Sequence, residues 1–301
     1  MKLKLVGAIF ICVAAMLWGL DGVVLTPRLH GLPVSFTVFI LHFFPFLIMQ
    51  PFLFRRYQKC RRLSWHGFGI LLLVSITGGF LGTYAIVKAL FLVNFNNLSV
   101  VVLLQKLQPL FAILLASLIL KEKLSRNFIF LAGAALAGAY LLTFGFKTPD
   151  LAGGQALPQA AFWALIAAGC FGSATVFGKM LLRELDFKTA TFARYGMTSL
   201  VTFLFLLISG TGFPFGSITI FQWAIALTIG LTTGSGAIFL YYYGLQHVEA
   251  SISTICELCL PLSAFILDWI VNETVLDPAQ WAGAGLLLLA ITMVSLSAKD
   301  H

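Results

Sequence analysis

Two apolar stretches of the chain, one around Pro109 and one around Pro261, carry charged side chains near their centres. When the stretches are superimposed on their prolines, Gln105 falls on Glu257, and Lys106 stands one position further along the first stretch. Both stretches are apolar enough to be embedded in a membrane, where a charged side chain is costly and usually has a function. Lys106 and Glu257 are therefore the first candidates for a binding site.

The chemistry of these two side chains suits a zwitterionic substrate. Lys106 would bind a carboxylate, and Glu257 would bind an ammonium group or carry a proton. Both lie about eight residues into their predicted spans, so a rise of ~1.5 Å per residue brings both near the midplane. The alternative is a structural ion pair with no substrate role.

Other side chains within the spans add to this pair. Tyr84 and Lys88 are four residues apart and share a helix face, although Lys88 can also extend toward the membrane surface. Arg194 lies deep enough to act as an anchor or a gate, and Trp18 is a candidate for the wall of an apolar cavity. The complete set of candidate substrate-binding residues is Lys106, Glu257, Arg194, Tyr84, Lys88, Trp18, Gln105 and Gln108.

No catalytic signature accompanies these residues. The sequence contains no His-Glu-x-x-His, no Gly-x-Ser-x-Gly and no Walker A loop. The five cysteines form no disulfide framework, and the Cys256-x-x-Cys259 spacing is better explained by two small residues on a helix than by a metal site. We therefore expect no enzyme activity, no catalytic residues, no bound metal and no cofactor.

The composition requires elements that lie inside a membrane. Hydrophobic residues make up 60% of the 301 and charged residues 10%, whereas soluble domains carry about 25% charged residues, and the mean hydropathy is +0.99. A span needs ~20 apolar residues, and the runs are unbroken, which excludes a barrel. Ten helices are predicted, at 5–25, 34–54, 67–90, 98–120, 127–145, 160–182, 189–209, 220–245, 249–271 and 279–297.

The distribution of Lys and Arg predicts the orientation. With the N-terminus inside, thirteen basic residues lie in cytoplasmic segments and two, Arg28 and Lys147, lie outside. This imbalance places both termini in the cytoplasm. The first apolar run continues to full spanning length, so it is a helix of the mature protein and not a signal peptide. The net charge of +8 therefore reflects topology, and no nucleic-acid partner is expected.

The two halves of the chain are related in sequence. Trp18-Gly19 matches Phe171-Gly172 at an offset of 153, Pro109 matches Pro261 at 152, and Glu122 matches Glu273 at 151. Each half holds five spans, so the second copy must be inverted in the membrane. Inverted repeats of this kind are typical of secondary transporters, with a site near the midplane. The predicted domains are residues 1–148 and 159–301.

Together these motifs resemble the EamA-type branch of the drug/metabolite transporter superfamily. The resemblance covers nearly the whole chain, and it implies a ten-helix 5+5 inverted repeat around a central cavity, transporting small metabolites or drugs, most often exporting amino acids. One departure is Leu41-His42, where the second repeat has Arg194-Tyr195 and family members often carry a basic residue. The motifs are Ala14-Ala15-Met16-Leu17-Trp18-Gly19, Leu90…Pro109…Glu122, Gly244-Leu245…Ala250…Pro261…Glu273 and Gln280-Trp281-Ala282-Gly283.

We therefore interpret the chain as a secondary transporter of the inner (plasma) membrane, in contact with lipid and acting as a monomer or homodimer. Its expected substrate is a small zwitterionic or anionic metabolite, an amino acid before others, moved outward by alternating access. Since no ATP-binding motif is present, a gradient must supply the energy, and Glu257 is the candidate proton carrier. The open alternatives are efflux of lipophilic cations, uptake of a phosphorylated or nucleotide-like anion, and a membrane enzyme acting on lipids.

Overall fold

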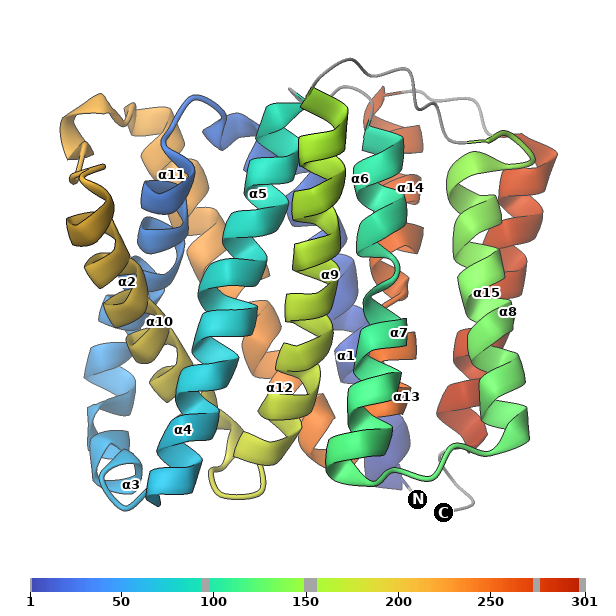
Figure 1. The fold of residues 1–301 in the computed structure, drawn as a ribbon, viewed down its shortest axis with the longest axis horizontal. Coiled ribbons are helices and arrows are strands. Elements are labelled where there is room, and N and C mark those ends of the chain that lie inside the picture. The colour runs from blue at the N-terminus through green and yellow to red at the C-terminus, as the bar shows by residue number, and fades with distance from the viewer. Residues whose placement is uncertain (1, 94–97, 149–155, 273–276, 298–301) are drawn as a thin grey trace.

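The computed structural model describes residues 2–93, 98–148, 156–272 and 277–297. Within these ranges every regular element is a helix, and ten helical segments are long and apolar enough to cross a membrane (Figure 1). Each of the ten overlaps one of the predicted spans. The all-α membrane fold expected from the composition is therefore confirmed.

The first repeat contains five spans, four of which include a π-helical, 3-10 or otherwise irregular turn. Its elements in chain order are α1 (Lys2–Leu20), η1 (Asp21–Leu25), η2 (Thr26–Leu29), α2 (Val34–Leu53), η3 (Phe54–Arg56), α3 (Tyr57–Cys60), α4 (Trp65–Val74), η4 (Ser75–Leu81), α5 (Gly82–Leu92), α6 (Leu98–Gln105), α7 (Gln108–Leu115), η5 (Ala116–Leu120) and α8 (Arg126–Phe144).

The second repeat also contains five spans. Its elements are α9 (Ala156–Leu181), α10 (Phe187–Ser209), η6 (Phe215–Ser217), α11 (Ile220–Ile229), η7 (Gly230–Gly234), α12 (Ser235–His247), α13 (Ala250–Cys256), α14 (Cys259–Asn272) and α15 (Pro278–Ser297).

Corresponding spans of the two repeats are interrupted at the same place. α6 gives way to α7 at Lys106 and Leu107, and α13 gives way to α14 at Glu257 and Leu258. A proline follows each interruption within a few residues, and its ring clashes with the carbonyl of the residue four positions before it. The sequence thus places a break in the middle of each span, where backbone groups become available to a cavity.

Helices of one repeat pack mainly against helices of the other. α1 packs against α12 and α14, α5 and α7 pack against α9, α2 packs against α10, and α8 packs against α15. Glycines permit the closest approaches, as small residues do in membrane bundles. A Cβ on Gly7 would lie 3.0 Å from the carbonyl oxygen of Gly244, and one on Gly138 would lie 2.8 Å from the amide of Leu287. The interface between the repeats is therefore the core of the molecule.

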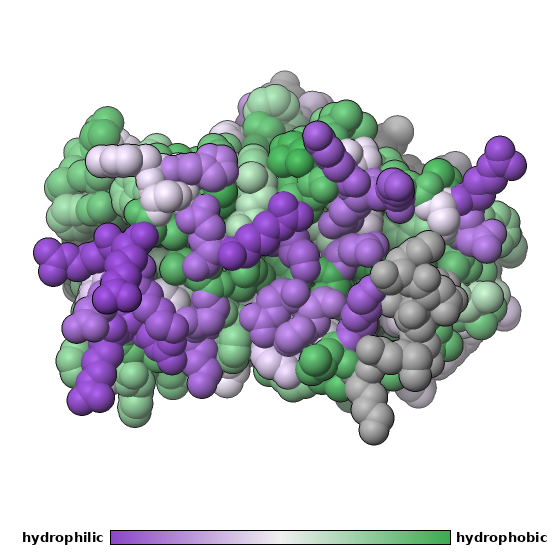
Figure 2. All heavy atoms as spheres, turned by 90° about the horizontal axis from the view of Figure 1, so that it is seen from below, coloured by the Kyte–Doolittle hydropathy of each residue, from purple (hydrophilic) through white to green (hydrophobic). Residues whose placement is uncertain are grey.

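One end of the bundle is strongly polar. α1 begins and α15 ends at this end, and α3 lies there as well (Figure 1). Figure 2 shows hydrophilic side chains gathered on this face, most densely on the side where α3 lies. The basic residues after α2, predicted to be cytoplasmic, thus lie on the same face as the start of α1 and the end of α15 (Figure 1).

Asp186 ties the basic segment after α2 to the second repeat. It accepts hydrogen bonds from Lys59 at 2.7 Å and Arg56 at 3.1 Å, and it caps α10 by accepting from the amide of Thr189 at 3.1 Å. Partial burial raises the pKa of Asp186, but the hydrogen bonds from Lys59 and Thr189 outweigh it and lower the pKa to about 2. The carboxylate is therefore held in its ionised form, which favours this contact between the repeats.

Candidate functional site

A cavity of about 280 Å³ lies between the two repeats. The lining reaches Thr26 and Leu90, which lie in η2 and near the end of α5, at the end of the bundle opposite the termini. Toward the termini the lining stops at Arg194, about two helical turns inside α10, and at Glu257, about two turns beyond the start of α13. The central cavity expected from the sequence is therefore present, and it extends from mid-depth toward the face opposite the termini.

Glu257 is the most heavily hydrogen-bonded side chain of the lining. Its Oε1 accepts from the hydroxyl of Tyr241 at 2.8 Å and from the hydroxyls of Thr175 and Ser253 at 3.3 Å each. Its Oε2 accepts from the amide of Gln108 at 2.5 Å. Only 9% of the residue is exposed. Every one of these donors is neutral, so the carboxylate is held without a cation.

The bond between Gln108 and Glu257 joins the two repeats at their broken spans. Gln108 begins α7, directly after the first interruption, and Glu257 lies in the second interruption. Gln105, which falls on Glu257 when the two prolines are superimposed, also lines the cavity. The polar centre of the site is therefore formed where the two interrupted spans meet.

Among the described residues that line the cavity, Arg194 is the one Lys or Arg. It is 7% exposed, its Nη1 donates to the hydroxyl of Tyr242 at 3.2 Å, and its guanidinium carbon lies 5.5 Å from the centre of the Tyr242 ring. In the ranges that the structure covers, no carboxylate forms an ion pair with it, since both ion pairs found there involve Asp186. Arg194 thus offers hydrogen-bond donors that the protein does not satisfy.

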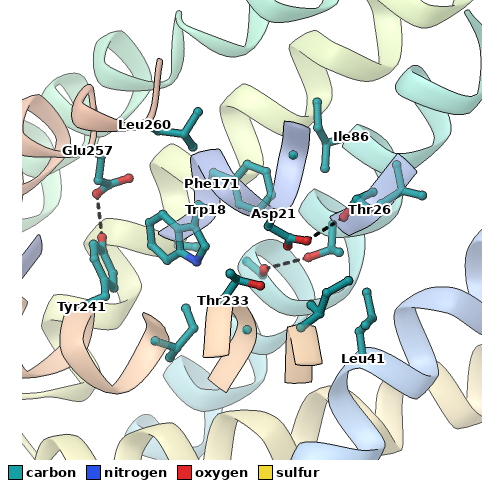
Figure 3. A pocket seen from close by; sticks show the side chains of 18 of the residues that line it. Trp18, Asp21, Thr26, Leu41, Ile86, Phe171, Thr233, Tyr241, Glu257 and Leu260 are labelled. Carbon is teal, nitrogen blue, oxygen red and sulfur yellow. Dashed lines mark hydrogen bonds between the residues drawn. The ribbon is translucent and has the colours of Figure 1, made fainter. Parts of the chain in front are cut away.

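Aromatic and aliphatic side chains form the wall between these polar groups. Figure 3 shows Trp18 and Phe171 close together in the middle of the pocket, with Glu257 and Tyr241 to one side and Asp21 to the other. The ring centres of Trp18 and Tyr241 are 5.3 Å apart at an interplanar angle of 54°. Such rings provide a large apolar contact area for a planar ligand.

Asp21 stands at the end of the cavity away from the termini. It begins the π-helical η1, and its Oδ1 accepts a hydrogen bond of 2.9 Å from the hydroxyl of Thr26 (Figure 3). Both residues belong to the lining. A second carboxylate therefore lies between the centre of the cavity and the face opposite the termini.

Lys106 does not line the cavity with Glu257. Its Nζ donates to Thr143 Oγ1 and, at 3.4 Å, to the carbonyl oxygen of Ala139, both on α8. The physical reason is angular: the amide of Lys106 still bonds to the carbonyl of Val102 in helical fashion, so Lys106 points ~100° away from Gln105. Lys106 and Glu257 thus hold similar positions along their spans, but the Lys106 side chain points to α8 and the Glu257 side chain points into the cavity.

Tyr84 and Lys88 also lie outside the lining. Tyr84 packs against the rings of Trp163 and Phe205, at 5.6 and 6.0 Å between centres. The predicted set thus divides in two, and a substrate role remains a prediction for every member of it. Glu257, Arg194, Trp18, Gln105 and Gln108 line the cavity, whereas Lys106, Tyr84 and Lys88 do not.

Several lining residues were not among the sequence candidates. They include His42 and Thr233, and the sequence signal for each is a polar residue within an apolar run. The side chain of Asp268, another charge within a span, and residue Glu273 lie outside the described residues. In the described part of the chain, no three His, Cys, Asp or Glu side chains are arranged to hold a metal ion.

The turn between α12 and α13 lies toward the termini from the cavity, and two charged side chains hold it. Lys179 Nζ donates to the carbonyls of Leu245 and Val248 at 2.7 and 2.6 Å, at the end of α12. Glu122 accepts from the backbone amides of Ala250 and Ser251 at 2.8 and 3.0 Å, at the start of α13. Each charge matches the partial charge of the helix end that it contacts, so the α12–α13 turn is fixed from both sides.

The chain is similar in sequence or in fold to several known proteins. The chain is 47% identical over 291 residues to the riboflavin transporter ImpX of Fusobacterium nucleatum, covering 96% of this chain and 97% of that protein. It is 25% identical over 240 residues to the uncharacterized transporter YetK of Bacillus subtilis, covering 77% and 69%. A solved crystal structure matches 97% of this chain and 98% of its own with a TM-score of 0.75 at 15% identity, which shows the fold alone.

The family profile matches the chain twice. The EamA-like transporter family accounts for residues 5–144 and again for residues 158–296. The chain is therefore a membrane transporter of small metabolites and not an enzyme. It belongs to the EamA-like transporter family.

Proposed function

We propose that the chain transports riboflavin, or a flavin close to it, through the cavity between its repeats. The observation that carries this proposal is the 47% identity, over nearly the full length of both chains, to a protein named as a riboflavin transporter. The side chains that line the cavity suit the chemistry of such a substrate. Riboflavin is neutral, with a planar ring system and a chain of hydroxyl groups, and the lining combines Trp18 and Phe171 with amides and hydroxyls.

The charges of the lining favour a neutral cargo. Arg194 is its single Lys or Arg among the described residues, which disfavours a polyanion such as a phosphorylated metabolite, and its presence also disfavours lipophilic cations. An amino acid, which the sequence favoured, could pair with Arg194 and Glu257, but it would leave the aromatic wall without a partner. Glu257 already accepts from four neutral donors. An amino acid is thus the alternative that the binding test must exclude.

Transport would follow alternating access. The repeats meet at the two interrupted spans, and the Gln108–Glu257 bond crosses between them. Rearrangement of this contact would open one end of the cavity while closing the other. The present arrangement, with the α12–α13 turn fixed at the end toward the termini, corresponds to access from the opposite face.

We also propose Glu257 as the proton carrier. The hydroxyls of Thr175, Tyr241 and Ser253 surround its Oε1, and a hydroxyl can donate or accept by rotating its hydrogen. The amide of Gln108 can likewise turn its oxygen toward Oε2. These four neutral groups would satisfy either protonation state of Glu257 without moving a helix, which suits a group that must gain and lose a proton in each cycle.

The orientation proposed from the sequence places both termini in the cytoplasm of a cell bounded by the plasma membrane. The basic residues after α2 lie at the same end of the bundle as the start of α1 and the end of α15 (Figures 1 and 2). That arrangement supports the positive-inside assignment. The cavity of this structure would then face the outside.

Binding of riboflavin to the purified protein tests this proposal. Stacking on the rings of the lining should quench flavin fluorescence and raise the melting temperature, and Trp18→Ala should weaken binding roughly tenfold because it removes an aromatic contact of ~1 kcal/mol or more. Trp65→Ala is the matched control, since Trp65 is 92% exposed, and it should bind like the parent. Stabilisation by amino acids, without any effect of riboflavin, would overturn the proposal.

A further inference from the structure

The described lining contains a cluster of three polar side chains from three different spans: His42 on α2, Arg194 on α10 and Thr233 in η7. Tyr195, the neighbour of Arg194, has its ring centre 5.2 Å from that of His42. The Tyr195 hydroxyl lies 3.6 Å from the position that a Cβ on Gly234 would occupy, next to Thr233. Tyr195 thus lies between His42 and the Thr233–Gly234 segment, and all of these residues line the same cavity as Arg194.

Arg194 brings unused donors to this region. A guanidinium group has five N–H donors, and among the described residues Arg194 donates one side-chain hydrogen bond, to Tyr242. Its Nη2 lies against Gly78, where a Cβ would come within 2.8 Å. The absence of a side chain at Gly78, itself part of the lining, thus lets the guanidinium lie at the cavity surface.

Thr233 brings a hydroxyl with no partner. The residue is completely buried, and its Oγ1 makes no hydrogen bond in the described structure. A buried polar atom without a partner costs ~1–3 kcal/mol, so a hydroxyl at a cavity wall is expected to serve a ligand. Figure 3 shows Thr233 on the side of the pocket opposite Ile86 and Phe171.

His42 brings an acceptor. Its Nδ1 lies 2.9 Å from the carbonyl oxygen of Val38, and because a carbonyl only accepts, Nδ1 must carry the hydrogen. In a neutral imidazole the other nitrogen, Nε2, is then an acceptor. The same region of the lining therefore offers a donor set at Arg194, a hydroxyl at Thr233 and an acceptor at His42.

We propose that His42, Arg194 and Thr233 bind the pyrimidine edge of the flavin ring, which presents a carbonyl, an N3–H and a second carbonyl in a row. This inference rests on the proposed function and goes beyond it by assigning the end of the substrate that each residue reads. Arg194 and Thr233 donate to the two carbonyls, and His42 Nε2 accepts from N3–H. The ring then extends along Trp18 and Phe171, and the hydroxyl chain reaches the other polar groups of the lining.

Riboflavin and N3-methylriboflavin, which lacks the N3 hydrogen, distinguish this arrangement from others. The parent protein should bind the methylated compound about tenfold or more weakly, since one hydrogen bond is lost and a buried acceptor is left without a donor. In His42→Phe, riboflavin itself should bind more weakly, and the ratio between the two compounds should fall toward one. Both affinities are measured by fluorescence quenching on purified protein.

Thr233→Val provides a second, nearly isosteric variant. It should weaken riboflavin binding about three- to tenfold, the worth of one neutral hydrogen bond, and it should leave the N3-methyl ratio intact. Thr232→Val is its control, because Thr232 is exposed and its hydroxyl bonds only within the helix, to Thr228.

The outcomes separate this inference from the proposed function. If the parent protein fails to bind riboflavin at all, the proposed function is wrong and this assignment falls with it. If riboflavin binds but the parent does not discriminate against the N3-methyl compound, or if His42→Phe keeps the full ratio, the pyrimidine edge lies elsewhere and only this assignment is overturned.

Discussion

Glu257 is a buried carboxylate whose partners are all neutral, and that distinguishes it from a structural ion pair. A carboxylate paired with Lys or Arg is held in its ionised form, whereas one surrounded by hydroxyls and an amide has partners for both forms. The other charged and titratable groups of the described lining are Asp21, His42, Arg194 and the phenols of Tyr195 and Tyr241, of which Tyr241 contacts Glu257 directly. This environment is the basis for expecting proton exchange at Glu257.

Glu257→Gln separates proton coupling from substrate binding. The amide preserves the shape of the side chain but cannot release a proton. In proteoliposomes with a pH difference of one unit, the parent should accumulate flavin up to about tenfold, because one pH unit is worth ~1.36 kcal/mol. The variant should lose accumulation while still exchanging labelled for unlabelled flavin. If it accumulates substrate as the parent does, the coupling group is not Glu257.

Lys106 shows what the sequence could and could not predict at this scale. Hydropathy placed Lys106 within an apolar span, where it lies at the interruption between α6 and α7. The match of the prolines paired Gln105 with Glu257. The direction of a side chain depends on its angle around the helix, and one residue changes that angle by ~100°. Gln105 therefore reaches the cavity, while Lys106 bonds to Thr143 and Ala139 on α8.

At the scale of elements, the interrupted spans and the α12–α13 turn make the polar contacts between the two repeats. Glu122, which follows the end of a span in the first repeat, caps α13 of the second repeat. Lys179 lies near the end of α9, where a lysine could simply extend toward the membrane surface. It instead bonds to three carbonyls at the end of α12 and before α13. Sequence spacing within one span cannot reveal a partner in another.

Glu122→Gln should weaken closure at the end toward the termini. Loss of the charge at the start of α13 removes a cap of ~1 kcal/mol, which corresponds to about a fivefold change in the balance of the two access states. A cysteine replacing Ile238, which lines the cavity, should then react faster with a charged maleimide applied from that end.

Glu184→Gln is the control for this measurement. Glu184 lies on the same polar face, is exposed, and accepts a bond from Ser64 instead of capping a helix. It should leave the labelling rate unchanged. Equal rates for Glu122→Gln and the parent would show that the turn is not part of the closure.

At the scale of the whole molecule, the fold followed from the sequence because its physical constraints are strong. Each span must satisfy its backbone internally, so length and hydropathy suffice to count helices, and an odd number of spans per repeat requires inversion. The cavity was expected from that symmetry. Its lining was predicted in part, because packing between repeats brings together residues such as His42, Arg194 and Thr233 that no local pattern connects.

The cargo itself is decided by transport measurements on the reconstituted protein. Proteoliposomes loaded with unlabelled riboflavin should take up labelled riboflavin faster than protein-free liposomes, and the uptake should be insensitive to added amino acids. Trp18→Ala should reduce this exchange roughly tenfold at low substrate concentration, since it weakens binding by about that factor, whereas Trp65→Ala should leave it unchanged. Uptake of riboflavin no faster than in protein-free liposomes, or exchange of amino acids in its place, would contradict a flavin site in the cavity between the repeats.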